Sequence, residues 1–206
     1  SDRKKSVLDI FSPALALSTI LVTLAYFFHI ITFYYVLKWT PTIVTEMGIG
    51  ASAASGVLTW ANVGGALGGA TFGLMTTKIG LKPLTIGILI LSMVGVAVFG
   101  QSAPEVNQLS YLAAFAGFFG NAGISGLYTL VAYVFPTHVR ATGTGFVIGI
   151  GRGGAVLSPI IAGYLLEGGA TLGTVGMIMG IGSLLGAVAL IFLKLNGSAT
   201  HSSNNA

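Results

Sequence analysis

Six long apolar stretches, separated by short polar or glycine-containing loops, constrain this chain more than any other feature. We expect them at about residues 13–38, 51–76, 83–101, 109–134, 142–166 and 171–194. About 20 apolar residues in a helix cross the hydrocarbon core of a bilayer, which is about 30 Å thick. Charged residues make up only 7% of the chain, against about 25% in soluble domains. The sequence therefore predicts an all-α membrane protein with six transmembrane helices over 13–194, located in the cell membrane. The first helix should end at Thr40-Pro41, because proline cannot continue the hydrogen-bond ladder.

The basic residues predict which side of the membrane holds the two ends of the chain. Six crossings place both ends on the same side. That side holds Arg3, Lys4, Lys5, Lys78, Lys82, Arg140 and Lys194, and the other holds Lys38. Because cytoplasmic loops carry an excess of lysine and arginine, we expect a cytoplasmic basic arm at 1–12 and a cytoplasmic tail at 195–206. The positive charge is thus a topology signal, and no nucleic-acid partner is expected.

Arg152 is the most informative single residue, because it lies inside the fifth apolar stretch. If that helix starts near Thr142, Arg152 lies about ten residues in, or roughly 15 Å along the axis. A permanent charge at this depth costs at least about 2.5–3.5 kcal/mol and normally faces the interior of a bundle or a wet cavity. We therefore expect Arg152 to bind an anionic group or to hold a gate. The alternative is an arginine paired with carbonyl groups near the cytoplasmic interface.

Other polar and aromatic side chains inside the spans are further candidates for contact with a substrate. Tyr26, His29 and Phe33 share one helix face. They form either an aromatic wall with one titratable group or an aromatic interfacial belt with a hydrogen-bonded histidine. The remaining candidates are Trp60, Asn62, Asn121 and Tyr128. Each of these also fits an alternative role in hydrogen bonding between helices.

The distribution of carboxylates limits the chemistry. All five Asp and Glu residues lie in tails or loops, so only His29 titrates near neutral pH inside the membrane. The sequence contains no paired carboxylates, catalytic triad or metal-ligand cluster, so we expect neither an enzyme nor a metal or other cofactor. The G-x-G-x-x-G pattern at 149–154 is not a dinucleotide site, because such a site needs a preceding strand.

Two loops resemble sequence patterns of a known family. Residues 73–82, GLMTTKIGLK, resemble the loop motif G-x-x-x-D-[RK]-x-G-[RK]-[RK] of the major facilitator superfamily. The matching positions are Gly73, Lys78, Gly80 and Lys82. Thr77 replaces the acid of the motif, and Leu81 replaces a basic residue. Residues 135–159, FPTHVRATGTGFVIGIGRGGAVLSP, are similar to the aromatic acid:proton symporters of that superfamily, the 4-hydroxybenzoate- and benzoate-type transporters.

This resemblance implies the carboxy-terminal half of a twelve-helix transporter, built from two three-helix inverted repeats. The partners it implies are an aromatic carboxylate, protons, the lipid bilayer and an amino-terminal six-helix half that is missing from this sequence. In that family two arginines matter for transport, and the resemblance carries this role to Arg140 and Arg152. Arg140, His138 and the loop motif are candidates for gating at the cytoplasmic end during alternating access, and Arg140 fits the role of a topology anchor equally well.

Two other functions stay open. Sugar and organic-ion porters share the P-T-x-x-R-A-T-G turn, so the solute could instead be a sugar, a dicarboxylate or a drug. A non-transporting membrane scaffold would use glycines at four-residue spacing, such as Gly65, Gly69 and Gly73, to bind partner helices. The intramembrane arginine argues against the scaffold.

Overall fold

The computed structural model describes residues 7–195, so most of the expected basic arm and tail lies outside the described residues. The elements are a short 3-10 helix, η1 (Val7–Phe11), and the α-helices α1 (Ala16–Glu46), α2 (Ala51–Thr76), α3 (Leu81–Gln101), α4 (Val106–Val134), α5 (Arg140–Gly151), α6 (Gly153–Glu167) and α7 (Leu172–Phe192). No strand occurs between residues 7 and 195. The predicted all-α fold is confirmed.

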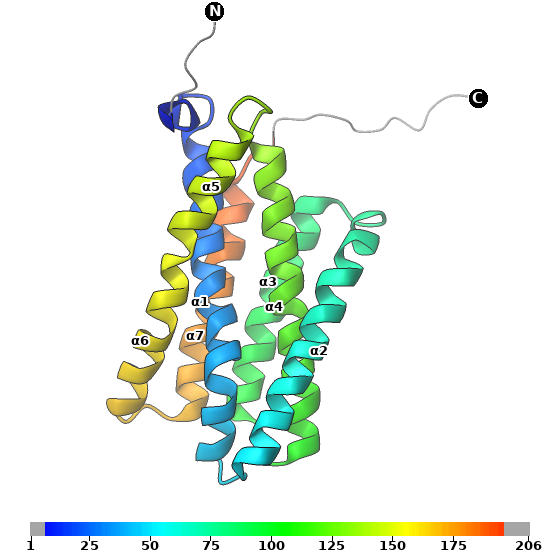
Figure 1. The fold of residues 1–206 in the computed structure, drawn as a ribbon, viewed down its shortest axis with the longest axis vertical. Helices are drawn as coiled ribbons and strands as arrows, with labels where there is room; N and C mark the ends of the chain where they lie inside the picture. The colour runs from blue at the N-terminus through cyan, green and yellow to red at the C-terminus, as the bar shows by residue number, and fades with distance from the viewer. Residues whose placement is uncertain (1–6, 196–206) are drawn as a thin grey trace, which may run out of the picture.

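Among residues 7–195, five helical segments are long and apolar enough to cross a membrane, with α5 and α6 counted as one segment over Arg140–Glu167. The sequence predicts six, and the difference is α2. This helix has 26 residues and no charged side chain, but its glycine and threonine residues, together with Asn62, keep its hydropathy low. It nevertheless runs alongside the other helices over much of the bundle (Figure 1).

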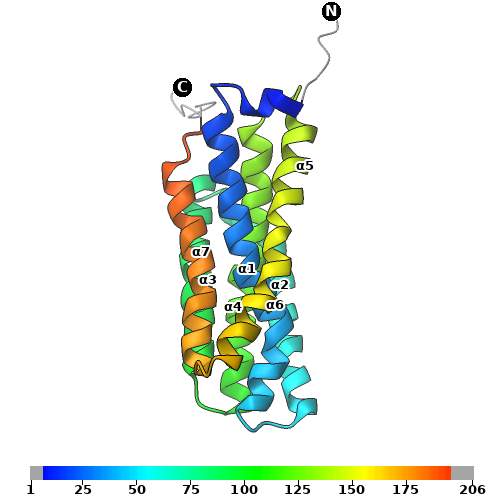
Figure 2. The ribbon, with the colours of Figure 1, turned by 90° about the vertical axis from the view of Figure 1, so that its left-hand side faces the viewer.

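The helices are arranged in two layers. In Figure 1, α2, α4, α1 and the α5–α6 pair form the layer nearer the viewer, which we call the front layer, and α3 and α7 lie behind it. Figure 2 shows the same arrangement from the side, with α7 on the left and α5 on the right. The turns between α2 and α3 and between α4 and α5 lie at the same end as η1, which we call the η1 end.

The two halves of the chain pack in a crossed pattern. The middle helix of the first half, α2, packs mainly on α4, whereas α5 and α6 pack mainly on α1. The last helices follow the same rule, because α3 contacts α4, α7 contacts α1, and α3 and α7 contact each other. If α1, α2 and α3 are exchanged with α4, the α5–α6 pair and α7, each main contact is therefore replaced by another main contact. This is the arrangement expected of two three-helix repeats.

Glycines bring the backbones of α2 and α4 into direct contact. A Cβ atom on Gly64 would collide with the carbonyl of Ala114, and one on Gly117 would collide with the carbonyl of Ala61. In lipid, where apolar side chains gain little by leaving the acyl chains, such close approach is a main source of helix association. The α2–α4 pair is thus held at a fixed, short separation.

The first helix ends later than the sequence predicts. Pro41 does not end it, because α1 continues to Glu46 with Pro41 inside it. Proline is tolerated in membrane helices where nearby groups support the disturbed backbone. Here the Thr40 hydroxyl donates to the Val36 carbonyl one turn back.

The fifth predicted span also differs from expectation, because it is divided between α5 and α6. Arg152 is the joint, since it lies between the two helices as the C-cap of α5 and the N-cap of α6. Glycines 149, 151, 153 and 154 surround it. Glycine costs about 1 kcal/mol per residue relative to alanine within a helix. The hydrogen-bond ladder of the helix is therefore weakest at this point.

Candidate functional site

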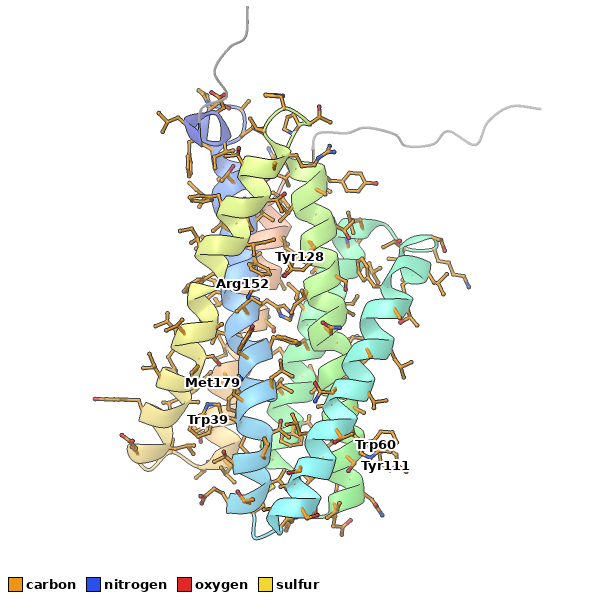
Figure 3. The ribbon with its side chains drawn as sticks, viewed as in Figure 1. Trp39, Trp60, Tyr111, Tyr128, Arg152 and Met179 are labelled. Carbon is orange, nitrogen blue, oxygen red and sulfur yellow. The ribbon has the colours of Figure 1, made fainter. Side chains whose placement is uncertain are left out.

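The joint between α5 and α6 places Arg152 near the middle of the bundle, in the front layer (Figure 3). Its side chain is exposed on this six-helix chain. Among residues 7–195, no group forms a hydrogen bond or ion pair with the Arg152 guanidinium. The alternative of an arginine paired with nearby carbonyls is therefore not what this structure shows. An uncompensated guanidinium can receive a carboxylate through two parallel hydrogen bonds.

Two tyrosines from different helices meet beside Arg152. The hydroxyl groups of Tyr26 on α1 and Tyr128 on α4 lie 3.1 Å apart, and the ring centroids are 5.6 Å apart. The Tyr26 ring packs against Gly151, the residue directly before Arg152. Tyr26 is buried, whereas Tyr128 is 40% exposed. The structure thus brings together three predicted site residues from three helical elements.

A hollow of about 270 Å³ opens between α1, α2 and α4. Its lining includes Phe33 and Leu37 from α1, Asn62 and Ala66 from α2, and Asn121 from α4. Three of these, Phe33, Asn62 and Asn121, are site residues predicted from the sequence. The Asn121 amide also donates to the Gly65 carbonyl at 2.7 Å, so it joins α4 to α2.

His29 lies behind this face and is completely buried. One ring nitrogen, Nε2, lies 2.8 Å from the Gly120 carbonyl, and the other, Nδ1, lies 2.8 Å from the Ser183 hydroxyl. Because a carbonyl oxygen only accepts, Nε2–H donates to Gly120, and Ser183 donates to Nδ1. His29 therefore joins α1 to α4 and α7 in this conformation. Its predicted contact with substrate stays a prediction.

Sequence reasoning did not single out the partners of His29. Ser183 lies 154 residues away along the chain, and its hydroxyl is also 3.4 Å from that of Ser92 on α3. A lone serine in an apolar helix is the only signal of either residue in the sequence. Both are buried, so they contribute to the packing behind the site and not to its open face.

Trp60 lies apart from the other candidates. It is 53% exposed and lies at the outer edge of α2, on the side away from α1 (Figure 3). The structure therefore does not bring it together with Arg152 or with the hollow. Trp60 could contact a substrate only together with a part of the protein that lies outside residues 7–195.

The predicted gating residues cluster at the η1 end. The Lys82 ammonium donates to the carbonyls of Ile191 and Leu193, at 3.2 and 2.6 Å, and so caps the end of α7. Arg140 Nε donates to the Phe135 carbonyl at 3.2 Å, which closes the turn between α4 and α5. The others, Gly73, Lys78, Gly80 and His138, are exposed. Lys82 and Arg140 thus stabilise loops in this conformation.

Comparison with known proteins identifies the family. Residues 16–206 match the model of the Major Facilitator Superfamily. The chain belongs to the major facilitator superfamily. The resemblance of the two loops to this superfamily is thereby confirmed, and the fold is that of half of a major facilitator protein.

Several curated members of the superfamily are similar to this chain. It is 34% identical over 170 residues to the 3-(3-hydroxy-phenyl)propionate transporter of Escherichia coli (strain K12), covering 82% of this chain and 41% of that protein. It is 32% identical to the benzoate transport protein of Acinetobacter baylyi, covering 77% of this chain and 34% of that protein. It is 31% identical to the 4-hydroxybenzoate transporter PcaK of Pseudomonas aeruginosa, covering 76% of this chain and 35% of that protein. The chain therefore spans well under half the length of these relatives.

Proposed function

We propose that this chain is the carboxy-terminal half of a transporter that takes up aromatic carboxylates with protons by alternating access. The observation that carries the proposal is the Arg152 guanidinium, which lies unpaired among residues 7–195 near the middle of the bundle and beside the Tyr26–Tyr128 pair. A carboxylate would compensate this charge, and the tyrosine rings would contact the apolar part of the solute. Relatives named for the transport of aromatic acids support this substrate class.

The amino-terminal half would cover the front layer. Arg152 and the hollow both lie on this layer, so a substrate held there would be enclosed between the two halves. This location fits major facilitator transporters, whose sites lie near the midplane between repeats. The main proton carrier would lie on that other half, because the carboxylates in the α-helices of residues 7–195, Glu46 and Glu167, are the last residues of α1 and α6.

We place the η1 end in the cytoplasm. Lys78, Lys82, Arg140 and Lys194 lie at this end, and Lys38 lies toward the other. This excess of basic residues fits the positive-inside rule. Both ends of the chain would then be cytoplasmic, and the protein would lie in the cell membrane.

Uptake of labelled aromatic acids by the full-length protein tests the proposal. Arg152→Ala should lower uptake efficiency by about ten- to a hundredfold, because hydrogen bonds to charged groups contribute about 1.5–3 kcal/mol and 1.4 kcal/mol is a factor of ten. Lys194→Ala, which removes an exposed cation beyond the end of α7, should leave uptake near the unaltered level. Uptake by Arg152→Ala equal to that of the unaltered protein would end the role given to Arg152.

The alternatives give different outcomes in the same system. If a sugar, dicarboxylate or drug competes in a substrate panel and no aromatic acid does, the substrate class is wrong. If purified full-length protein gives no flux of any solute in proteoliposomes, a membrane scaffold is favoured. Alkalinisation of the medium during uptake of the acid would support proton symport, and its absence would contradict it.

A further inference from the structure

The hollow between α1, α2 and α4 is suited to a single aromatic ring. Its volume of about 270 Å³ is just below the range of about 300–1,000 Å³ found for pockets that hold drug-sized ligands. Phe33 and Leu37 supply an apolar wall, and Ala66 leaves the opposite wall without a bulky side chain. A flat, rigid and mostly apolar group fits this lining.

Two amides give the hollow its polar groups. The Asn121 Nδ2 group donates to the Gly65 carbonyl at 2.7 Å, and the Asn62 Nδ2 group donates to the Leu58 carbonyl at 3.0 Å. These bonds fix the orientation of each amide, because its nitrogen faces a backbone carbonyl. Between residues 7 and 195, no donor bonds to either amide oxygen. Because an amide oxygen only accepts hydrogen bonds, these two lining residues each keep an acceptor free for a ligand that carries an O–H group.

The hollow lies about two helical turns from the Tyr26–Tyr128 pair, which is near Arg152 in Figure 3. Tyr26 and Phe33 are seven residues apart on α1, and Asn121 and Tyr128 are seven residues apart on α4. At 1.5 Å per residue, each pair is separated by about 10 Å along its helix. One substituted ring spans this separation if it makes a hydrogen bond of about 2.8 Å at each end.

We propose that this hollow receives the ring of the aromatic acid and that Asn62 and Asn121 select rings that carry a hydroxyl group. The carboxylate would lie toward Arg152, and the ring hydroxyl would donate to an amide oxygen. This inference rests on the proposed function, because it names the part of the same site that distinguishes one aromatic acid from another. Benzoate fills the hollow but leaves both amide oxygens without a donor, whereas 4-hydroxybenzoate supplies one.

Competition in the full-length transporter tests the inference with Asn62→Ala. Asn62 is exposed and its amide bonds only to its own helix among the described residues, so its loss should not disturb the α2–α4 contact. The inhibition constants of benzoate and 4-hydroxybenzoate are measured against uptake of a labelled aromatic acid. The ratio of the two constants gives the preference for the hydroxyl group. It should fall about two- to tenfold in Asn62→Ala, since a neutral hydrogen bond contributes about 0.5–1.5 kcal/mol and 1.4 kcal/mol is a factor of ten.

A matched control separates this effect from a general loss of an amide. Asn107→Ala makes the same change at an exposed position near the start of α4, outside the hollow, and should leave the ratio unchanged. An unchanged ratio in Asn62→Ala, or no preference for the hydroxyl group in the unaltered protein, would overturn the inference while uptake of aromatic acids persists. If no aromatic acid is transported or competes, the proposed function fails as well, so the two failures are distinguishable.

Discussion

The ring of Tyr26 occupies the space beside Gly151 that a side chain would otherwise fill. A Cβ atom on Gly151 would collide with this ring. Because Gly151 is the last residue of α5 and Arg152 follows it, Tyr26 determines how closely α1 approaches the joint between α5 and α6. The position of the Arg152 charge therefore depends on a contact made by its neighbour.

Gly151→Ala should displace either the Tyr26 ring or the joint. Inserting a methyl group into a well-packed site costs typically about 1–3 kcal/mol, so the full-length protein should unfold at a lower temperature and transport less. Thermal unfolding in detergent and uptake measure the two effects. Gly87→Ala is the control, because a Cβ atom there meets nothing within 4 Å. Normal uptake and an unchanged unfolding temperature in Gly151→Ala would show that this contact does not determine the geometry of the joint between α5 and α6.

His29→Ala should destabilise the bundle. It removes two hydrogen bonds that join α1 to α4 and α7, each contributing about 0.5–1.5 kcal/mol, and it leaves a cavity in a fully buried site, which adds to the cost. The expected loss of unfolding free energy is therefore roughly 2–4 kcal/mol, measured by denaturant or thermal unfolding of the full-length protein. Full stability combined with lost substrate affinity would instead support direct contact between His29 and substrate.

Gly117→Ala should disrupt the α2–α4 contact. The added Cβ atom would meet the backbone carbonyl of Ala61, which cannot rotate away as a side chain can. We expect little correctly folded protein in the membrane, measured by fluorescence-detected gel filtration of the tagged full-length protein. Gly56→Ala on α2 has open space around the new atom and should express normally. Equal expression of both variants would contradict the close packing of these two backbones.

Lys82→Met should loosen the end of α7. The Lys82 ammonium bonds to the Ile191 and Leu193 carbonyls, and a cation at a helix C-terminus contributes about 0.3–1 kcal/mol. Faster hydrogen exchange of the last amides of α7 is expected, with Lys82→Arg retaining part of the protection. Lys78→Met, at an exposed lysine of the same loop, is the control. Unchanged exchange in Lys82→Met would assign Lys82 another role.

Much of the fold was predictable, because lipid permits few ways of satisfying the hydrogen-bonding groups of the backbone. Long apolar stretches and short loops therefore predict the helices and their order along the chain. Pro41 was not predictable in the same way, since its tolerance depends on the surrounding groups. The composition of α2 also differs from that of a typical span, because the helix meets α4 through glycine.

The site was predicted in its residue types but not in its geometry. Arg152 stood out because a charge in an apolar helix has few explanations. By contrast, the rotation of α1 determines that Tyr26 meets Tyr128 while His29 turns toward Ser183. That rotation depends on contacts between residues more than a hundred positions apart. Such contacts cannot be predicted from the spacing of residues within one helix.

The crossed packing of the repeats also bears on how the chain assembles during synthesis. The principal neighbour of α2 is α4, which leaves the ribosome only after α3 has followed α2 into the bilayer. Until then α2, with its low hydropathy and its row of glycines, lacks its main contact surface. The tight backbone packing of α2 can therefore form only once α4 has entered the bilayer.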